Sequence, residues 1–238
     1  MRTARTATFI FCLYLMTLAF SAMAADVVVI GSNAPLIKPG QIVTADALLE
    51  IPVGARVTLV SESGKTVTVN GPHSGPLFIA GNSSEKQSLI SALSSLLSIS
   101  EKEKSSVGLI RANIPPTPAA PWVIDIGRSG DHCVPAGSPV KLWRARNTKA
   151  RTLSLKNLAD KSSSDTDWLA ATRTLNWPSK VTLEDGASYF VQLKGARTGR
   201  TLVVHLVPAE LPSDAHRAVW MAEKGCVDQA KQLLARLR

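Results

Sequence analysis

Residue types that commonly carry out chemistry are few and widely spaced in this sequence. The four histidines are His73, His132, His205 and His216. None of them belongs to a metal-binding spacing such as His-x-Glu-x-x-His, and the sequence contains no Cys-x-x-Cys pair. We therefore expect neither a bound metal ion nor another cofactor.

One dense cluster of reactive residue types occurs, at Asp131-His132-Cys133. A thiol enzyme would need a base that can reach the sulfur of Cys133. Adjacent residues of a strand point to opposite faces, so His132 is badly placed for that role. A disulfide bond at Cys133 would also remove the nucleophile.

Two other patterns have only a superficial similarity to catalytic motifs. The segment from Gly71 to Gly75 contains Ser74, but it is not Gly-x-Ser-x-Gly and lacks the strand–turn–helix context of a nucleophile elbow. We expect a glycine-rich turn there. Four carboxylates lie in expected loops without a convergent partner, so a glycosidase pair has no support; these are Asp165, Asp167, Glu184 and Asp185. The sequence therefore predicts no catalytic residues.

Two groups of residues are candidates for binding. The five tryptophans all lie in the second half of the chain, where they could fill a core or stack on sugar rings of the cell wall. The densest basic run contains Lys141, Arg144, Arg146, Lys149 and Arg151. This run could be a solvated strand face or a contact surface for an acidic partner. We take it as the best candidate contact surface.

The first 24 residues have the pattern of a secretory signal peptide. Arg2 and Arg5 supply the positive charge, an apolar stretch runs from Phe9 to Phe20, and Ala22-Met23-Ala24 fits a cleavage site. No later apolar run approaches the roughly 18–20 residues that span a bilayer. We therefore expect cleavage near Ala24, a periplasmic or secreted protein without a transmembrane segment, and no nucleic-acid partner.

Cysteine usage fits an exported chain. Two cysteines remain after the leader, Cys133 and Cys226. In an oxidising compartment such a pair favours a disulfide bond, and two buried free thiols are the alternative. A bond between them would close a loop of roughly 90 residues and stabilise the fold by about 4–5 kcal/mol in the chain-entropy description.

Residues 26–82 are expected to form a small β domain. The chain has 238 residues, of which 45% are hydrophobic, so a sizeable core is available. Val57 and Leu59 alternate with polar residues, and Val67 and Val69 do the same after a turn at Glu62–Gly64. This pattern predicts a hairpin with one apolar face.

The same region resembles the FecR-like β domain of bacterial envelope proteins. The resemblance rests on Pro39-Gly40-Gln41, Ile51-Pro52-x-Gly54-Ala55, Val57-x-Leu59, Gly64-Lys65-x-Val67 and Gly71-Pro72-x-Ser74-Gly75. It implies a short β-rich module, and the best-known members are periplasmic parts of signalling systems that control extracytoplasmic sigma factors. This chain departs from them, since a cleavable leader stands where those regulators have a cytoplasmic segment and a membrane span.

The remaining chain divides into four further parts. Residues 83–104 have helical spacing of Leu89, Ile90, Leu93, Leu96 and Leu97, with a capping box at Ser84-x-x-Gln87, and residues 105–121 form a proline-rich linker. Residues 122–208 predict a β-sandwich, for which Ig-like topology is one option. The prediction rests on short β-type runs at 122–126, 140–144, 151–155, 181–183, 189–193 and 201–207. Residues 212–238 predict a helical hairpin that resembles half a tetratricopeptide repeat and docks on the β domain.

These observations predict a mainly β, non-catalytic envelope protein. Its function would be that of a sensor or adaptor that binds a protein partner in a periplasmic complex or signalling system. The alternative is a module that binds cell-wall glycan, either peptidoglycan or another polysaccharide, through exposed tryptophans.

Overall fold

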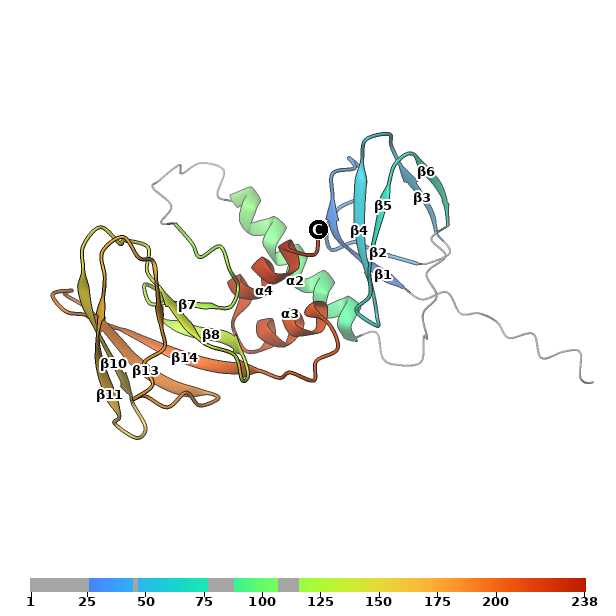
Figure 1. The fold of residues 1–238 in the computed structure, drawn as a ribbon. Helices are drawn as coiled ribbons and strands as arrows, with labels where there is room; N and C mark the ends of the chain where they lie inside the picture. Colours follow the sequence, from blue (N-terminus) through green and yellow to red (C-terminus); the bar gives the residue numbers. More distant parts are fainter. Residues whose placement is uncertain (1–25, 45–46, 77–87, 107–115) are drawn as a thin grey trace, which may run out of the picture.

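The computed structural model describes residues 26–44, 47–76, 88–106 and 116–238. The expected signal peptide, most of the expected linker and the capping box at Ser84 and Gln87 lie outside these residues. The fold is mainly β, and Figure 1 shows two β units on either side of a layer of helices. Within the described residues, no helix combines the length and the apolarity that crossing a membrane would need.

The N-terminal β unit contains the first six strands. They are β1 (Val27–Ser32), β2 (Ile42–Val43), β3 (Leu48–Ile51), β4 (Arg56–Ser61), β5 (Thr66–Asn70) and β6 (His73–Pro76). One antiparallel sheet has the order β2-β1-β4-β5, and β3 pairs with β6. The predicted hairpin is β4–β5, with Val57 opposite Val69 and Leu59 opposite Val67.

Strand β1 is buried on both faces because each face covers a different core. Val27 and Val29 point into the core of the N-terminal unit. Val28 and Ile30 point the other way, into a core formed mainly by helices. The continuous apolar run of β1 is therefore what joins the N-terminal sheet to the helices.

Helix α2 (Ser88–Ser106) confirms the helical spacing seen in the sequence. Its five predicted apolar residues are all buried in the helical core, namely Leu89, Ile90, Leu93, Leu96 and Leu97. The first turn is capped from a distance, because the Glu62 carboxylate accepts the N–H groups of Leu89 at 3.0 Å and Ile90 at 3.2 Å. A carboxylate at this end also interacts favourably with the helix dipole.

The second β unit is a sandwich of two sheets. Its strands are β7 (Val123–Asp125), β8 (Gly130–Pro135), β9 (Lys141–Trp143), β10 (Arg151–Asn157), β11 (Ser163–Trp168), β12 (Thr174–Asn176), β13 (Ala187–Leu193) and β14 (Arg200–Val207). The sheet orders are β11-β10-β13-β14-β8 and β12-β9-β7. Two of the pairs, β8 with β14 and β7 with β9, are parallel. Apolar residues from both sheets form one core between them.

Several predictions for the sandwich were wrong in detail. Residues 181–183 do not form a strand, although Val181 is buried in the core. Strands β8, β11 and β12 were not expected. Asp165 and Asp167 therefore lie on the edge strand β11 rather than in a loop.

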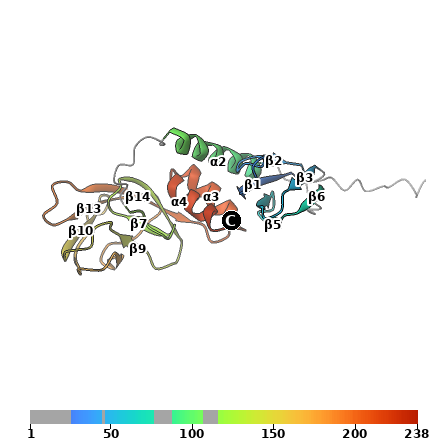
Figure 2. The same ribbon diagram turned by 90° about the horizontal axis from the view of Figure 1, so that it is seen from above.

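The C-terminal helical hairpin consists of α3 (Asp214–Glu223) and α4 (Val227–Ala235). Ser213 caps α3 by accepting the N–H of His216, and Gly225 turns the chain between the helices with a φ of 85°. Cys226 at this turn is disulfide-bonded to Cys133 on β8, which confirms the predicted pair. Figure 2 shows α3 and α4 alongside α2, between the two β units. The hairpin thus contacts α2 and both β units rather than the sandwich alone.

Candidate binding surface

The five residues of the predicted basic run occupy different environments. Lys141 begins β9, Arg151 begins β10, and both are exposed, as are Arg146 and Lys149 in the connection between these strands. Arg144 is buried, with only 3% of its surface exposed. Arg144 therefore has to be removed from the predicted contact surface, since a partner could not reach it.

Arg144 instead holds two loops of the sandwich together. Its guanidinium donates to the backbone carbonyls of Thr172 at 3.2 Å, Lys149 at 3.3 Å and Leu169 at 2.6 Å. The same group lies over the Trp168 ring, 4.7 Å from its centroid. Burial, and to a lesser degree the charge of Arg151, lower the pKa of Arg144, but an arginine remains charged at neutral pH. Its bonds to carbonyls and its ring contact compensate for the loss of water around the charge.

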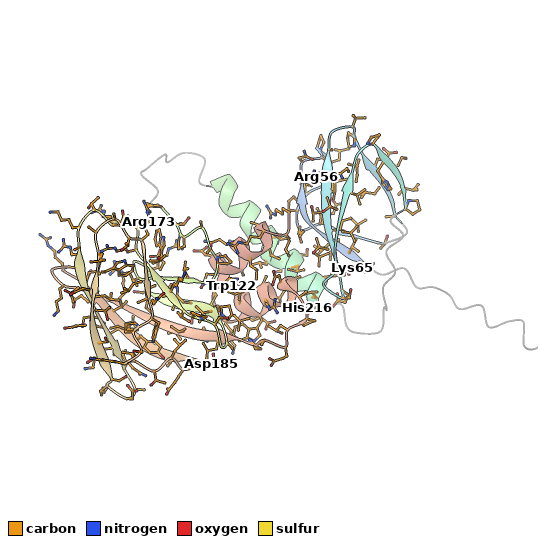
Figure 3. The ribbon with its side chains drawn as sticks, in the orientation of Figure 1. Arg56, Lys65, Trp122, Arg173, Asp185 and His216 are labelled. Carbon is orange, nitrogen blue, oxygen red and sulfur yellow. A yellow bond between two sulfur atoms is a disulfide. The ribbon has the colours of Figure 1, made fainter. Side chains whose placement is uncertain are left out.

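Backbone hydrogen bonds fix the two loops against each other. The Arg144 N–H donates to the Arg173 carbonyl at 3.0 Å, and the Ala171 N–H donates to the Asn147 carbonyl at 2.7 Å. Residues 144–150 and 169–173, which are distant in sequence, therefore form one surface. Figure 3 shows Arg173 in the sandwich, on the other side of the helices from Arg56 and Lys65.

We call Arg146, Lys149, Arg151, Arg173 and Leu169 the basic loop surface. Leu169 is 68% exposed, and the four cations are exposed as well. Among the described residues, Arg146, Lys149 and Arg173 form no ion pair. On the adjoining strand β11, Asp167 accepts the Thr152 hydroxyl at 2.9 Å, and Asp165 pairs with Lys194 at 2.8 Å. The surface is therefore positively charged and includes one exposed apolar side chain.

Sequence reasoning missed Arg173 and Leu169. They follow β11, whose polar sequence predicts a loop, so no local signal places them beside the β9–β10 connection. Lys141 was included in the run, but it lies at the start of β9, at the other end of the strand from this connection.

The tryptophans do not form an exposed platform. Trp143 and Trp168 are buried, and Trp122, Trp177 and Trp220 are half-buried. Trp177 donates its indole N–H to the Val181 carbonyl at 2.8 Å and contacts the Tyr189 ring edge to face. The observed burial is that of core residues, and no observation favours sugar stacking.

The reactive residue types are engaged in structural contacts. Cys133 is in the disulfide bond, and the buried His132 lies 3.2 Å from the Arg128 carbonyl through its Nε2. His205 and Asp131 form a pair at 2.8 Å on neighbouring strands. Within the described residues, no three side chains of His, Cys, Asp or Glu are grouped as a metal site would require.

A groove of about 910 Å³ lies where the helices meet the sandwich. Its walls come from α2, from β7 and β8, and from the α3–α4 turn, with Leu96, Val123 and Val227 among the apolar residues. An exposed ion pair between Arg128 and Asp228 stands at this groove. The groove has less distinct chemistry than the basic loop surface, because apolar and polar groups of both charges line it.

Neither the protein-family models nor the curated proteins with which we compared the chain include a match. The assignment of function therefore rests on the residues and their geometry.

Proposed function

We propose that this chain is an exported, non-catalytic protein of the bacterial envelope that binds a protein partner as a sensor or adaptor. The observation that carries the proposal is the basic loop surface, with its exposed cations and the buried Arg144 beneath it. The partner would present an acidic patch with an apolar contact for Leu169.

A surface held in this way favours binding over catalysis. Arg144 and two backbone hydrogen bonds fix both loops before a partner arrives, so less conformational entropy is lost on association. Unpaired cations accelerate the encounter with an acidic surface and orient it. The exposed Leu169 supplies apolar area that a partner would cover.

The disulfide and the leader pattern support the export part of the proposal. Disulfide bonds persist in the periplasm and outside the cell, and are rare in the cytosol. The resemblance of residues 26–82 to a FecR-like domain points to the same compartment and to a signalling or assembly role. We extend the proposal to that role on the resemblance alone.

Crosslinking in living cells, followed by affinity purification and mass spectrometry, tests the proposal. The test variant carries Arg146→Gln, Lys149→Gln and Arg173→Gln. The matched control loses the same charge elsewhere, through Lys38→Gln, Lys156→Gln and Lys180→Gln, all at exposed positions. We expect a partner protein to be enriched with the wild type and the control, and its enrichment to fall at least tenfold with the test variant.

Three results would contradict the proposal. One is equal enrichment of the same partner with the test variant and with the wild type. Another is recovery of muropeptides without a protein partner, which would favour glycan binding. The third is a chain that remains in the cytoplasm with its leader attached.

A further inference from the structure

Strand β5 is an open edge of the N-terminal sheet. It pairs with β4 on one side and ends the strand order β2-β1-β4-β5. Figure 2 shows β2 next to α2 and β5 on the side of the unit away from that helix. The outer side of β5 is therefore the side on which a further strand could be added.

The hydrogen-bond pattern shows which backbone groups face outward. The Ser61 N–H donates to the Lys65 carbonyl at 3.0 Å, and the Gly71 N–H donates to the Ala55 carbonyl at 2.8 Å. In an antiparallel ladder, residue pairs that are hydrogen-bonded to each other alternate with pairs that are not. Counting from these two bonded pairs, the backbone groups of Val67 and Val69 are hydrogen-bonded to β4. The N–H and C=O groups of Thr66, Thr68 and Asn70 must then point outward, and nothing in the described part of the chain bonds to them.

The other long strand edges in the described part of the molecule are protected, whereas β5 is not. On β8, the Gln229 side chain bonds both backbone groups of Cys133. On β11, Asp165 and Asp167 place charge along the edge, which discourages strand addition. Strand β5 contains neither a charged residue nor a proline, and it has five residues in regular pairing.

We propose that β5 pairs with β5 of a second copy of this chain, antiparallel and about a two-fold axis at Thr68. The sequence of β5 is self-complementary in that arrangement. Thr68 meets its own counterpart, Thr66 meets Asn70, and the half-buried Val67 meets Val69. Lys65 would lie opposite Gly71, so no like charges face each other.

The backbone geometry fits the same arrangement. Because the Thr68 N–H and C=O both point outward, the two copies of Thr68 exchange both hydrogen bonds across the axis. The two four-stranded sheets then become one continuous sheet, and the interface is isologous. This inference does not depend on the proposed function. If both hold, the dimer carries two basic loop surfaces and gains avidity for a repeated partner.

Sedimentation of the protein purified from the periplasm tests self-association, over about 1 µM to about 1 mM. Thr68→Pro removes the outward N–H without removing a bond to β4, as edge positions allow, and Thr68→Ala keeps that N–H. We expect dimers in the wild type and in Thr68→Ala, with the dissociation constant at least tenfold higher in Thr68→Pro. Near-ultraviolet circular dichroism verifies that each variant is folded.

Cysteine crosslinking tests the register independently of the proline variant. Bonded partners in an antiparallel pair have Cα atoms about 5.5 Å apart, within the range of a disulfide. With diamide as oxidant, Thr68→Cys should form inter-chain dimers, whereas Thr66→Cys alone should not. A mixture of the two single variants, Thr66→Cys and Asn70→Cys, should form inter-chain dimers.

The inference is overturned if the wild type remains monomeric at every concentration. It is also overturned if Thr68→Pro is folded and associates as the wild type does, or if Thr66→Cys alone crosslinks as readily as Thr68→Cys. Loss of partner binding in the basic loop variant with unchanged dimerisation would separate the two proposals.

Discussion

Gln229 on α4 completes the backbone hydrogen bonding of Cys133 on β8. Its Oε1 accepts the Cys133 N–H at 2.8 Å, and its Nε2 donates to the Cys133 carbonyl at 2.8 Å. The side-chain amide thus takes the place that a neighbouring strand would occupy. Because Cys133 is also disulfide-bonded to Cys226, the helices and the sandwich are joined at one residue by a covalent bond and two hydrogen bonds.

Replacing Gln229 should destabilise the protein more than replacing its neighbour Gln232. Gln229→Met leaves a buried donor and a buried acceptor of Cys133 without partners, and we expect a loss of about 2–4 kcal/mol in the free energy of unfolding. Gln232 lies on the same helix, but its buried Oε1 has no hydrogen-bond partner. Gln232→Met should therefore change stability little, and chemical denaturation of the disulfide-intact proteins measures both. Equal losses would contradict this account.

Removal of the disulfide bond should lower stability by about 4–5 kcal/mol, because the bond closes a long loop in the unfolded chain. The two cysteines are 93 residues apart. The double variant Cys133→Ala, Cys226→Ala and the reduced wild type should unfold at similar denaturant concentrations. If the free energy of unfolding is unchanged after complete reduction, verified by thiol titration, the helical core alone holds the helices and the sandwich together.

The sequence predicted those elements whose signals are local. Alternation in Val57–Leu59 and Val67–Val69 defined the β4–β5 hairpin, and the spacing of Leu89, Leu93 and Leu97 defined α2. The C-terminal helices have local signals of the same kind, a cap at Ser213 and a turn at Gly225. These patterns depend on neighbours within a few residues, so tertiary context did not obscure them.

Elements that depend on distant partners were missed. Strand β8 contains Gly130, Asp131 and Pro135, which have low strand propensity, and it exists because β14 pairs with it. The polar residues of β11 were read as a loop for a similar reason. The burial of Arg144 could not be predicted from a run of exposed basic residues, because its carbonyl partners at 169 and 172 lie on another loop.

Arg144 should matter for stability, whereas Arg146 should not. Arg144→Met removes the guanidinium donor from three carbonyls, of which the Leu169 carbonyl still accepts the Thr172 hydroxyl at 2.7 Å. We expect a loss of about 2–4 kcal/mol together with faster hydrogen exchange in residues 169–173. Arg144→Lys should recover only part of this, because an ammonium cannot reach three acceptors as a guanidinium does. The exposed Arg146→Met is the control, with a change below about 0.5 kcal/mol. An equal effect at both positions would contradict the assigned role.

Alanine substitutions at Gly64 and Gly54 distinguish the cost of backbone strain from the cost of a steric clash. Both have a positive φ, of 77° and 78°, but a Cβ at Gly64 would lie 2.1 Å from Ser213 Oγ, while nothing lies within 4 Å at Gly54. Figure 3 shows Lys65, the residue after Gly64, on the side of the hairpin that faces His216. Gly54→Ala should cost about 1–2 kcal/mol for its left-handed backbone.

Gly64→Ala should cost at least about 1 kcal/mol more than Gly54→Ala, because the contact of the β4–β5 turn with α3 must open. Thermal unfolding of the two variants side by side measures the difference. If both lose the same stability, the turn does not hold α3 in solution.

Acidification should destabilise the fold through the buried His132 and the half-buried His216. Burial lowers the pKa of His132, and this outweighs the opposing effects of the Arg128 carbonyl and of Asp125 and Asp131. Burial also lowers the pKa of His216, against the opposing charge of Glu62. As the pH falls below about 6.5, the unfolded chain binds protons that the folded chain does not.

The free energy of unfolding should therefore fall with decreasing pH below that point, by at most about 1.4 kcal/mol per pH unit for each histidine. From about pH 7.5 upward neither histidine contributes a slope, since both are then neutral in both states. His132→Gln preserves a donor for the Arg128 carbonyl and removes the titration, so its stability should depend less on pH between about 6.5 and 5. An unchanged slope in this variant, with His216→Gln measured alongside, would show that His132 is protonated as readily in the folded protein as in the unfolded chain.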